Sequence, residues 1–368
     1  MQNTFLKTSL LSFILFCAAC KTPLQKATNK SEAKAKNIIL LIGDGMGLSQ
    51  LSSAYYYSNK TPNFSRFKHI GLHQPMPIGA KITDSAAGAT AFATGYKSYN
   101  GAIGVDKDSI PRETILEWTA KNGKSTGVIA TSTITHATPA SFYAHVPSRQ
   151  MHEAIAEDFI KTPIDFAAGG GSKHFNKRAD NRNLLDSLKA KGTITNLKQL
   201  SQSHDLIQGN SYCYLLDLDS LQSIEGGRDN FLPKSTKLAL NFLSKDPDGF
   251  FLMVESSQID WGGHSNKGSF LIKEVLDFDQ TIGAVLDFAE KDGNTLVIVT
   301  ADHETGGFAL SSTKAFGKDN YKGIQPTFST GGHTAALIPV FAYGPGAEDF
   351  NGVYQNNDIF KKMMANFR

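Results

Sequence analysis

The chain contains little cysteine. Of its 368 residues only three are cysteines, Cys17, Cys20 and Cys213, and two of these lie close to the N-terminus. A framework of disulfide bonds of the kind found in small secreted domains is therefore excluded for the mature protein. Core packing, with or without bound metal ions, must stabilise the fold.

The chain also lacks an excess of charge of either sign. Its 37 Lys and Arg residues nearly balance its 34 Asp and Glu residues. Such a balance gives no broad positive field that would hold nucleic acid non-specifically. We therefore expect no nucleic acid as a specific partner. The sequence also has no internal repeat and no extended low-complexity segment.

Long hydrophobic runs are absent except near the N-terminus, where the run Leu10–Ala19 follows Lys7 and precedes Cys20. This order is typical of a bacterial export signal, and the run is too short to span a bilayer comfortably as a permanent anchor. Small residues directly before Cys20 resemble a lipoprotein processing site, so lipidation of Cys20 and ordinary cleavage nearby both stay open. The expected divisions are an export signal at 1–20, a flexible linker at 21–36 and a folded domain at 37–368, in the periplasm or anchored to a membrane as a lipoprotein.

Five short apolar runs indicate buried strands. They are Asn37–Ile42, Thr126–Ala130, Phe250–Val254, Thr295–Thr300 and Ile338–Ala342. Helical patterns separate them, the clearest being Ser269–Glu290 with apolar residues at near-helical spacing. Strands that alternate with helices predict an α/β fold with a large, mostly parallel central sheet flanked by helices. The stretch Lys161–Pro233 has weaker periodicity, and we interpret it as an insertion or a covering region.

Acidic residues follow three of the predicted strands. Asp44, Glu255 and the Asp302–His303 pair each come at the C-terminal end of a strand. Ligands of open α/β sheets bind at that edge. Carboxylates from strands far apart in sequence are therefore candidates for one shared site.

Further candidate ligands follow Glu255. Asp260 and His264 lie four residues apart and share a face if this stretch is helical. Oxygen and nitrogen ligands of this kind suit borderline and hard cations. Taken alone, this pair is more often solvated and His333 is more often an ordinary loop histidine. The neighbouring strand-end carboxylates favour a metal site.

The segment Thr83–Thr90 predicts the start of a helix. Asp84 or Ser85 could simply cap that helix. Alternatively, the free amides and the positive end of the helix dipole favour an anion beside Ser85. A serine hydroxyl is a weak nucleophile until a base or a metal activates it. No Ser-His-Asp signature is evident, so the candidate ligands favour activation by metal.

From Asn37 to the C-terminus the chain resembles the alkaline phosphatase family. The resemblance rests on separated motifs in the same order: a strand followed by GDGMG, then TDSAAGATA, THATPASFYAH, SR, VESSQIDWGGH, TADHETGG and GGHT. It implies the family's fold, a homodimer, and a catalytic domain at 37–368 that hydrolyses phosphate monoesters to alcohol and inorganic phosphate. It also implies two zinc ions and one magnesium ion as cofactors.

The resemblance further implies a role for each motif residue. Ser85 would attack the ester and form a phosphoserine, which water then hydrolyses, and Arg149, oriented by Asp84, would clamp the phosphate. The implied metal ligands are Asp260, His264 and His333 for the first zinc, Asp44, Asp302, His303 and Ser85 for the second zinc, and Asp44, Thr138 and Glu255 for magnesium.

Two positions beside the third metal set depart from the enterobacterial pattern. His136 stands where that pattern has aspartate, and Trp261 stands where it has lysine. The combination resembles that of some cold-active bacterial members, and we expect His136 and Trp261 to bind the substrate together with Arg149 and Asp84. Loss of a negative charge near magnesium and of a positive charge near phosphate predicts weaker occupancy of the third metal site and faster product release. Both could instead be packing substitutions.

Two other kinds of function stay open. A phosphodiesterase of the same superfamily is the nearest, but Thr138 and Glu255 together with Arg149 favour monoesters. The sulfatase motif Cys/Ser-x-Pro-x-Arg does not occur in the sequence, and phosphomutases lie further away. A lipid-anchored protein that only binds phosphate or metal is the alternative from a different class.

Overall fold

The computed structural model describes residues 34–202, 206–315 and 317–368. The expected export signal and most of the expected linker therefore lie outside the described residues. Ala35 is fully buried, its N–H donates to the carbonyl of Asn366 at 2.7 Å, and it forms a parallel bridge with Phe367. The compact part of the chain thus already includes Ala35, which contacts Asn366 and Phe367 near the C-terminus.

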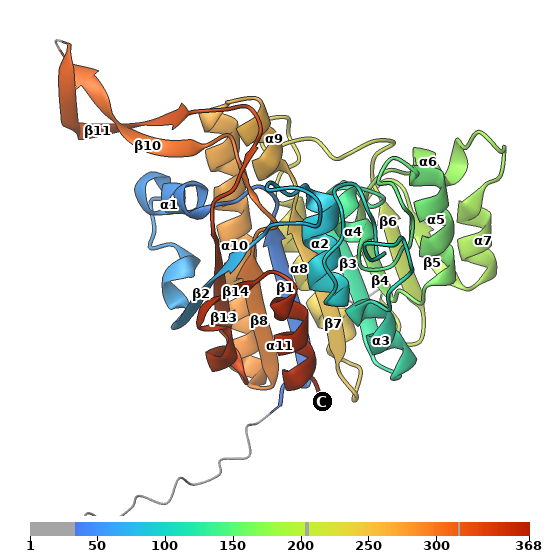
Figure 1. The fold of residues 1–368 in the computed structure, drawn as a ribbon. Coiled ribbons are helices and arrows are strands. Elements are labelled where there is room, and N and C mark those ends of the chain that lie inside the picture. The colour runs from blue at the N-terminus through green and yellow to red at the C-terminus, as the bar shows by residue number, and fades with distance from the viewer. Residues whose placement is uncertain (1–33, 203–205, 316) are drawn as a thin grey trace, which may run out of the picture. The chain divides into compact units, whose positions relative to one another are not determined.

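A ten-stranded sheet forms the centre of the fold, in the order β14-β2-β13-β8-β1-β7-β3-β4-β6-β5 (Figure 1). Within this sheet only β13 runs against the others. The five predicted strands are β1, β3, β7, β8 and β13, so the predicted fold class is confirmed. The strands are β1 (Asn37–Gly43), β2 (His69–Gln74), β3 (Ser125–Thr133), β4 (Phe166–Gly170), β5 (Thr193–Asn196), β6 (Ser211–Leu215), β7 (Phe250–Ser256), β8 (Thr295–Thr300), β13 (Ile338–Tyr343) and β14 (Gly352–Gln355).

Helices cover both faces of this sheet (Figure 1). Along β1, Ile38, Leu40 and Ile42 face one apolar core, while Ile39 and Leu41 face the other. The first core is shared with α2 (Ser85–Thr94), α3 (Ile115–Lys121), α4 (Ala137–Ala140), α5 (His152–Lys161), α6 (Lys173–Asn176), α7 (Leu184–Ala190) and α11 (Asp358–Asn366). The second is shared with α1 (Leu48–Tyr57), α8 (Phe231–Leu243), α9 (Gln258–His264) and α10 (Gly268–Asp292). Burial on both faces explains why the central strands are apolar without alternation.

The weak periodicity of Lys161–Pro233 suggested an insertion or a covering region. The stretch is instead part of the central sheet. It supplies β4, β6 and β5, which extend the sheet beyond β3 in parallel. These strands are only four or five residues long, and β4 is Phe-Ala-Ala-Gly-Gly. Strands so short carry too weak an apolar pattern to be recognised from sequence, and in β4 small residues weaken it further.

Two small antiparallel ribbons lie outside the central sheet. β10 (Phe308–Ala315) and β11 (Lys318–Phe328) form a hairpin that projects from the rest of the fold (Figure 1). β9 (Glu304–Thr305) pairs with β12 (His333–Thr334), so the second ribbon fixes His333 beside the end of β8. Among the described residues, no helix has both the length and the apolar character needed to cross a membrane.

A buried ion pair offers a test of the fold's stability. Arg228, with its side chain 2% exposed, contacts Glu274 at 2.5 Å and Asp277 at 3.0 Å. Arg228→Ala would leave both carboxylates without their cation, so we expect unfolding free energy to fall by about 3–5 kcal/mol. As a control, Arg66→Ala removes a partly exposed arginine paired with Asp287 and Glu290, and should cost about 1 kcal/mol or less. Urea unfolding of both variants measures the difference, and equal losses would contradict it.

Candidate active site

The carboxylates predicted at strand ends lie together. Strands β7, β1 and β8 are neighbours, and Ile42 is in register with both Glu255 and Thr300. Asp44 and the Asp302–His303 pair follow β1 and β8 at the same edge of the sheet. Ligand atoms of Asp44, Asp302 and His303 lie within 4.8 Å of one another, and all three residues are fully buried. The structure therefore brings together the residues that the resemblance implies for the second zinc.

A second group lies next to the first. Asp260 and His264 occupy one face of α9, and the Asp260 Oδ1 atom is 3.4 Å from His264 Nε2 and 3.6 Å from His333 Nε2. The two imidazole Nε2 atoms are 3.1 Å apart. Each ring donates its Nδ1 proton to a backbone carbonyl, His264 to Gly331 at 2.7 Å and His333 to Thr83 at 2.8 Å. With each Nδ1 bonded to a carbonyl, the two Nε2 atoms are the ring nitrogens available to a shared cation.

Glu255, Thr138 and His136 define a third group around Asp44. Ligand atoms of Asp44, Glu255 and His136 lie within 4.8 Å of one another. Thr138 belongs to α4, the short helix after His136, and is fully buried with Glu255. His136 therefore lies beside the third metal set, where the sequence comparison with the enterobacterial pattern placed it.

Several polar atoms of this cluster have no hydrogen-bond partner. These buried atoms are both carboxylate oxygens of Asp44, one oxygen each of Asp302 and Glu255, the Thr138 hydroxyl and His136 Nδ1. An unpaired buried polar atom costs about 1–3 kcal/mol, and charged groups cost more. Divalent cations held by these oxygen and nitrogen atoms would satisfy them, so the residues fit a group of bound metal ions.

Burial and neighbouring charges shift the pKa values of the carboxylates in the cluster. Burial, and then the negative charges of Asp302 and its neighbours, raise the pKa of Asp44 well above its usual value. Burial raises the pKa of Glu255 to about 8. Burial also acts to raise the pKa of Asp260, but the hydrogen bond from His333 and the adjacent imidazoles lower it overall. Carboxylates forced together in this way are relieved when a cation lies between them.

Ser85 begins α2 as the sequence predicted, and its Oγ is 3.3 Å from His303 Nε2. The helix cap is Asp84, whose Oδ1 accepts the N–H of Ala87 at 3.0 Å. Ser85 is therefore free of the capping role that was its alternative. Its hydroxyl lies at the positive end of a ten-residue helix, next to the group formed by Asp44, Asp302 and His303.

Asp84 also reaches Arg149. Its Oδ2 accepts hydrogen bonds from Arg149 Nη1 and from the Gly101 N–H, both at 3.0 Å. Arg149 Nη2 lies 3.3 Å from His136 Nε2, and the ring of His136 meets that of Trp261 edge-on at 6.4 Å. Burial, and then the charge of Arg149, lower the pKa of His136 to about 3, so its ring is neutral. The guanidinium is therefore held in place by Asp84, the residue before Ser85, and by His136.

Two side chains around the site, Glu304 and Thr305, had no role assigned from the sequence. Glu304 accepts the N–H of Phe308 and hydrogen bonds from Gln50 and Thr334, so it ties α1 to the ribbon that carries His333. Thr305 lies between Asp260 and His303. Glu304 and Thr305 directly follow Asp302 and His303 in the sequence, and this position could have marked them as candidates. The sequence did not show which residues they contact.

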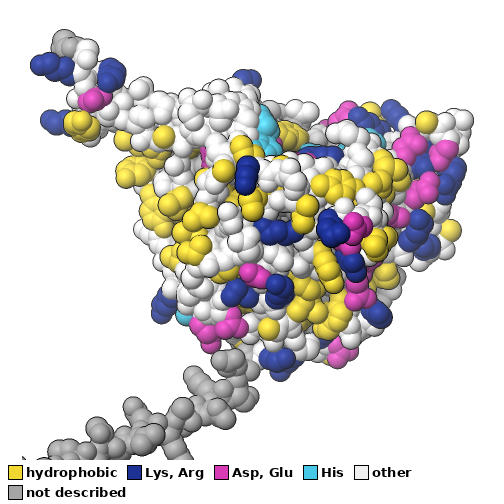
Figure 2. Space-filling view, viewed as in Figure 1, with side chains coloured by type: hydrophobic (Ala, Val, Ile, Leu, Met, Phe, Trp, Pro, Cys, Tyr) yellow, Lys and Arg dark blue, Asp and Glu magenta, His cyan; other side chains and the backbone are white. Residues whose placement is uncertain are grey.

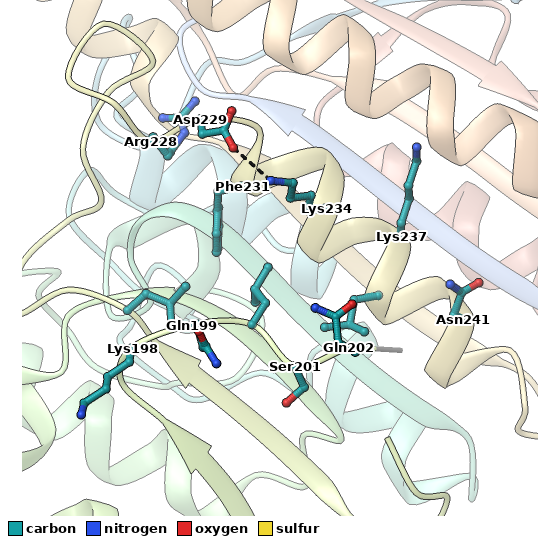
Figure 3. A pocket seen from close by; sticks show the side chains of 13 residues that line it. Lys198, Gln199, Ser201, Gln202, Arg228, Asp229, Phe231, Lys234, Lys237 and Asn241 are labelled. Atoms are coloured by element: carbon teal, nitrogen blue, oxygen red, sulfur yellow. Dashed lines mark hydrogen bonds and ion pairs between the residues drawn. The ribbon is translucent and has the colours of Figure 1, made fainter. Parts of the chain in front are cut away.

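A separate cavity lies away from this cluster. It has a volume of about 740 Å³ and lies between residues 198–202 and the first turns of α8, with Phe231 on its wall (Figure 3). None of the predicted site residues lines it. Histidine side chains are instead visible at the surface beside the base of the β10–β11 hairpin (Figure 2), and the side chain of His264 is 43% exposed.

Comparisons with known proteins agree with this geometry. The family model described as alkaline phosphatase matches residues 35–327. Alkaline phosphatase 3 of Bacillus subtilis is 33% identical, with 97% of this chain and 96% of that protein covered. Alkaline phosphatase of Escherichia coli is 31% identical, with 91% and 86% covered. The structure of alkaline phosphatase from the Antarctic bacterium TAB5 has 51% identity and a TM-score of 0.89, covering 91% of this chain and 98% of that one.

A doubly covered α/β sheet with acidic residues, histidines and a helix-terminal serine at one edge defines an enzyme with a metal-binding site. The chain belongs to the alkaline phosphatase family, the family that its motifs indicated. It is therefore a phosphomonoester hydrolase of a metal-dependent family. In two variants of the TAB5 enzyme, a histidine is replaced by aspartate or glutamate and Mg is bound in the site named M3.

Proposed function

We propose that this enzyme hydrolyses phosphate monoesters through a phosphoserine on Ser85. The observation that carries the proposal is the place of Ser85 Oγ, 3.3 Å from His303 Nε2 and beside a buried cluster whose carboxylate oxygens lack partners. Asp260, His264 and His333 would hold one zinc, and Asp44, Asp302 and His303 with Ser85 a second. Asp44, Thr138 and Glu255 would hold magnesium.

The bound cations would lower the pKa of nearby hydroxyl groups and balance charge on the phosphate. Ser85 Oγ, its proton lost to solvent, attacks phosphorus as the ester oxygen leaves and takes up a proton. The phosphoryl group now on Ser85 is attacked by water from the opposite side, which releases phosphate and restores the serine. Arg149, fixed by Asp84, donates to equatorial phosphate oxygens in both steps.

A comparison of two esters tests this reaction class. With p-nitrophenyl phosphate and its bis-ester, we expect kcat/KM to favour the monoester by at least about 10²-fold, because Arg149 and the third ligand group complement a dianionic phosphate. A preference for the diester would favour the phosphodiesterase alternative. Binding of phosphate by the metal-loaded protein without hydrolysis of either ester would favour the alternative of a binding protein.

The third metal site should respond to His136. We expect His136→Asp to bind Mg²⁺ at least about tenfold more tightly than the wild type, because a carboxylate replaces a neutral ring with an unpartnered nitrogen. The Mg-bound variants of the TAB5 enzyme support this direction. Mg²⁺ titration calorimetry measures the change in Mg²⁺ affinity. Trp261→Lys is the companion variant, for which inhibition of the enzyme by phosphate is measured. Unchanged Mg²⁺ affinity in His136→Asp would contradict the assignment.

We also propose a homodimer. Large hydrophobic side chains gather on the face formed by α1 and the β2–β14 edge (Figure 2). They are Leu48, Tyr55, Tyr56, Ile70 and Val353, all exposed. A patch of this kind on a soluble domain marks an interaction surface. In sedimentation velocity, Tyr56→Glu with Val353→Glu should yield monomer, while Ile194→Glu on β5, at the opposite edge of the sheet, should stay dimeric. A dimer that persists in the first variant would contradict this face.

Export with a lipidated Cys20 is proposed from residues outside the described part of the chain. The order of Lys7, the apolar run Leu10–Ala19 and Cys20 supports it. If Cys20 carries the anchor, Cys20→Ala should move the enzyme from the membrane fraction to the soluble fraction of exported proteins. An unchanged distribution would favour ordinary cleavage.

A further inference from the structure

Thr305 contacts a residue of each of two ligand groups. Its Oγ1 lies 2.5 Å from Asp260 Oδ1 and 3.1 Å from His303 Nδ1, and the residue is fully buried. Asp260 belongs to the group with His264 and His333, whereas His303 belongs to the group with Asp44 and Asp302. Thr305 is the second residue of β9, two positions after His303.

The position of Thr305 is fixed by its backbone as well. Its N–H donates to the carbonyl of Gly45 at 3.1 Å, and its carbonyl accepts from Gln50 Nε2 at 2.8 Å. A Cβ at Gly45 would lie 2.8 Å from Thr305 Oγ1, and a Cβ at Gly263 would lie 2.9 Å from Thr305 Cβ. Glycine at these two positions leaves the space that the threonine side chain occupies.

The direction of the two hydrogen bonds follows from the donors available. A threonine hydroxyl has one proton, and an ionised carboxylate can only accept. The hydroxyl donates to Asp260 Oδ1, the nearer of its two partners at 2.5 Å. The Thr305 oxygen then faces His303 Nδ1 with its lone pairs, which requires that Nδ1 carry the proton of the neutral ring.

This arrangement leaves His303 Nε2 without a proton. That atom lies 3.4 Å from Asp44 Oδ1, 3.4 Å from Asp302 Oδ2 and 3.3 Å from Ser85 Oγ. A ring with the opposite tautomer would place an N–H there, which cannot bind a cation.

We propose that Thr305 is a positioning residue that fixes the tautomer and orientation of His303 and, through Asp260, couples the two zinc positions. The inference rests on the function proposed above, because it takes His303 and Asp260 as zinc ligands. Thr305 itself touches neither substrate nor, in this account, metal. Its hydroxyl oxygen accepts from His303 Nδ1 and its hydroxyl proton is donated to Asp260, so one side chain contacts both ligand groups.

Zinc affinity tests the proposal without measuring activity. Metal-free wild type, Thr305→Val, Thr305→Ala and Thr305→Ser compete for zinc with a chromogenic chelator at pH 8. We expect Thr305→Val and Thr305→Ala to bind zinc about 10–100-fold more weakly, because His303 Nδ1 loses its acceptor. Thr305→Ser keeps the hydroxyl and should stay within about threefold of the wild type.

The matched control is Thr119→Val in α3. Thr119 is also fully buried, and its hydroxyl donates to the Ile115 carbonyl at 2.6 Å, away from the ligands. It should lose stability without losing zinc affinity. Wild-type affinity in a folded Thr305→Ala or Thr305→Val would overturn the positioning role and leave the proposed function standing. A wild type that binds no zinc would overturn the proposed function as well.

Discussion

Replacing Ser85 with alanine should lower kcat/KM for p-nitrophenyl phosphate by on the order of 10³-fold or more. The variant keeps the α2 cap, because Asp84 rather than Ser85 accepts the Ala87 N–H. It also keeps Arg149 on Asp84. What it loses is the oxygen that attacks phosphorus, so hydrolysis is left with water and the remaining charges of the site.

The control for this variant is Ser235→Ala. Ser235 is another buried helical serine, and its Oγ donates to the Phe231 carbonyl at 2.8 Å within α8. It lies outside the proposed machinery, so its kcat/KM should stay within about twofold of the wild type. If Ser85→Ala kept a tenth or more of the wild-type rate while folded, Ser85 would not be the nucleophile.

Removal of the metal ions is expected to have the second large effect. Chelation should abolish turnover, and zinc should restore most of it while magnesium alone should not. Bound ions also stabilise the folded state, by about 2.7 kcal/mol at a free concentration of 100 times Kd. Thermal unfolding midpoints of chelated and reloaded protein should therefore differ. Full activity after exhaustive chelation would contradict the account.

The pH dependence of the stability of the metal-free protein also tests the buried ligand cluster. Burial raises the pKa of Glu255 from its usual 4.5 to about 8 in the folded protein. Between these values the folded state holds a proton that the unfolded state has lost, so stability should fall as pH rises from about 4.5 to about 8. Unfolding midpoints measured at pH 5 and pH 8 should show this fall, and Glu255→Gln should reduce it. Reloading with zinc and magnesium should oppose it.

Much of the fold could be predicted because the central strands are buried on both faces. The runs that became β1 and β8 contain only apolar and β-branched residues between their first and last positions, and helix α10 keeps its apolar spacing over 25 residues. The strands β4, β5 and β6 escaped prediction because four or five residues are too few to show a clear period, and in β4 most of them are alanine or glycine. Pairing with neighbouring strands, which is not visible in a local pattern, places them in the sheet.

The candidate site was partly predictable for a related reason. A carboxylate directly after a buried strand is conspicuous, so Asp44 and Asp302 stood out from the residues alone. Arg149 did not, since only its contacts with Asp84 and His136 in the folded chain distinguish it from a surface arginine. Thr305 and Glu304 were hidden more completely, because their importance lies in which atoms they join across separate elements. Such contacts appear only when the chain is folded.

The most direct test of the central claim is to find the phosphoryl group on the enzyme. The zinc-loaded protein is mixed with p-nitrophenyl phosphate, stopped in acid within its first turnovers, digested and analysed by mass spectrometry. The account predicts a phosphoryl group on Ser85 and on no other residue, and none in Ser85→Ala. Turnover by the wild type with no phosphoryl group on Ser85, together with inversion of configuration at phosphorus in a chiral phosphate ester, would contradict it.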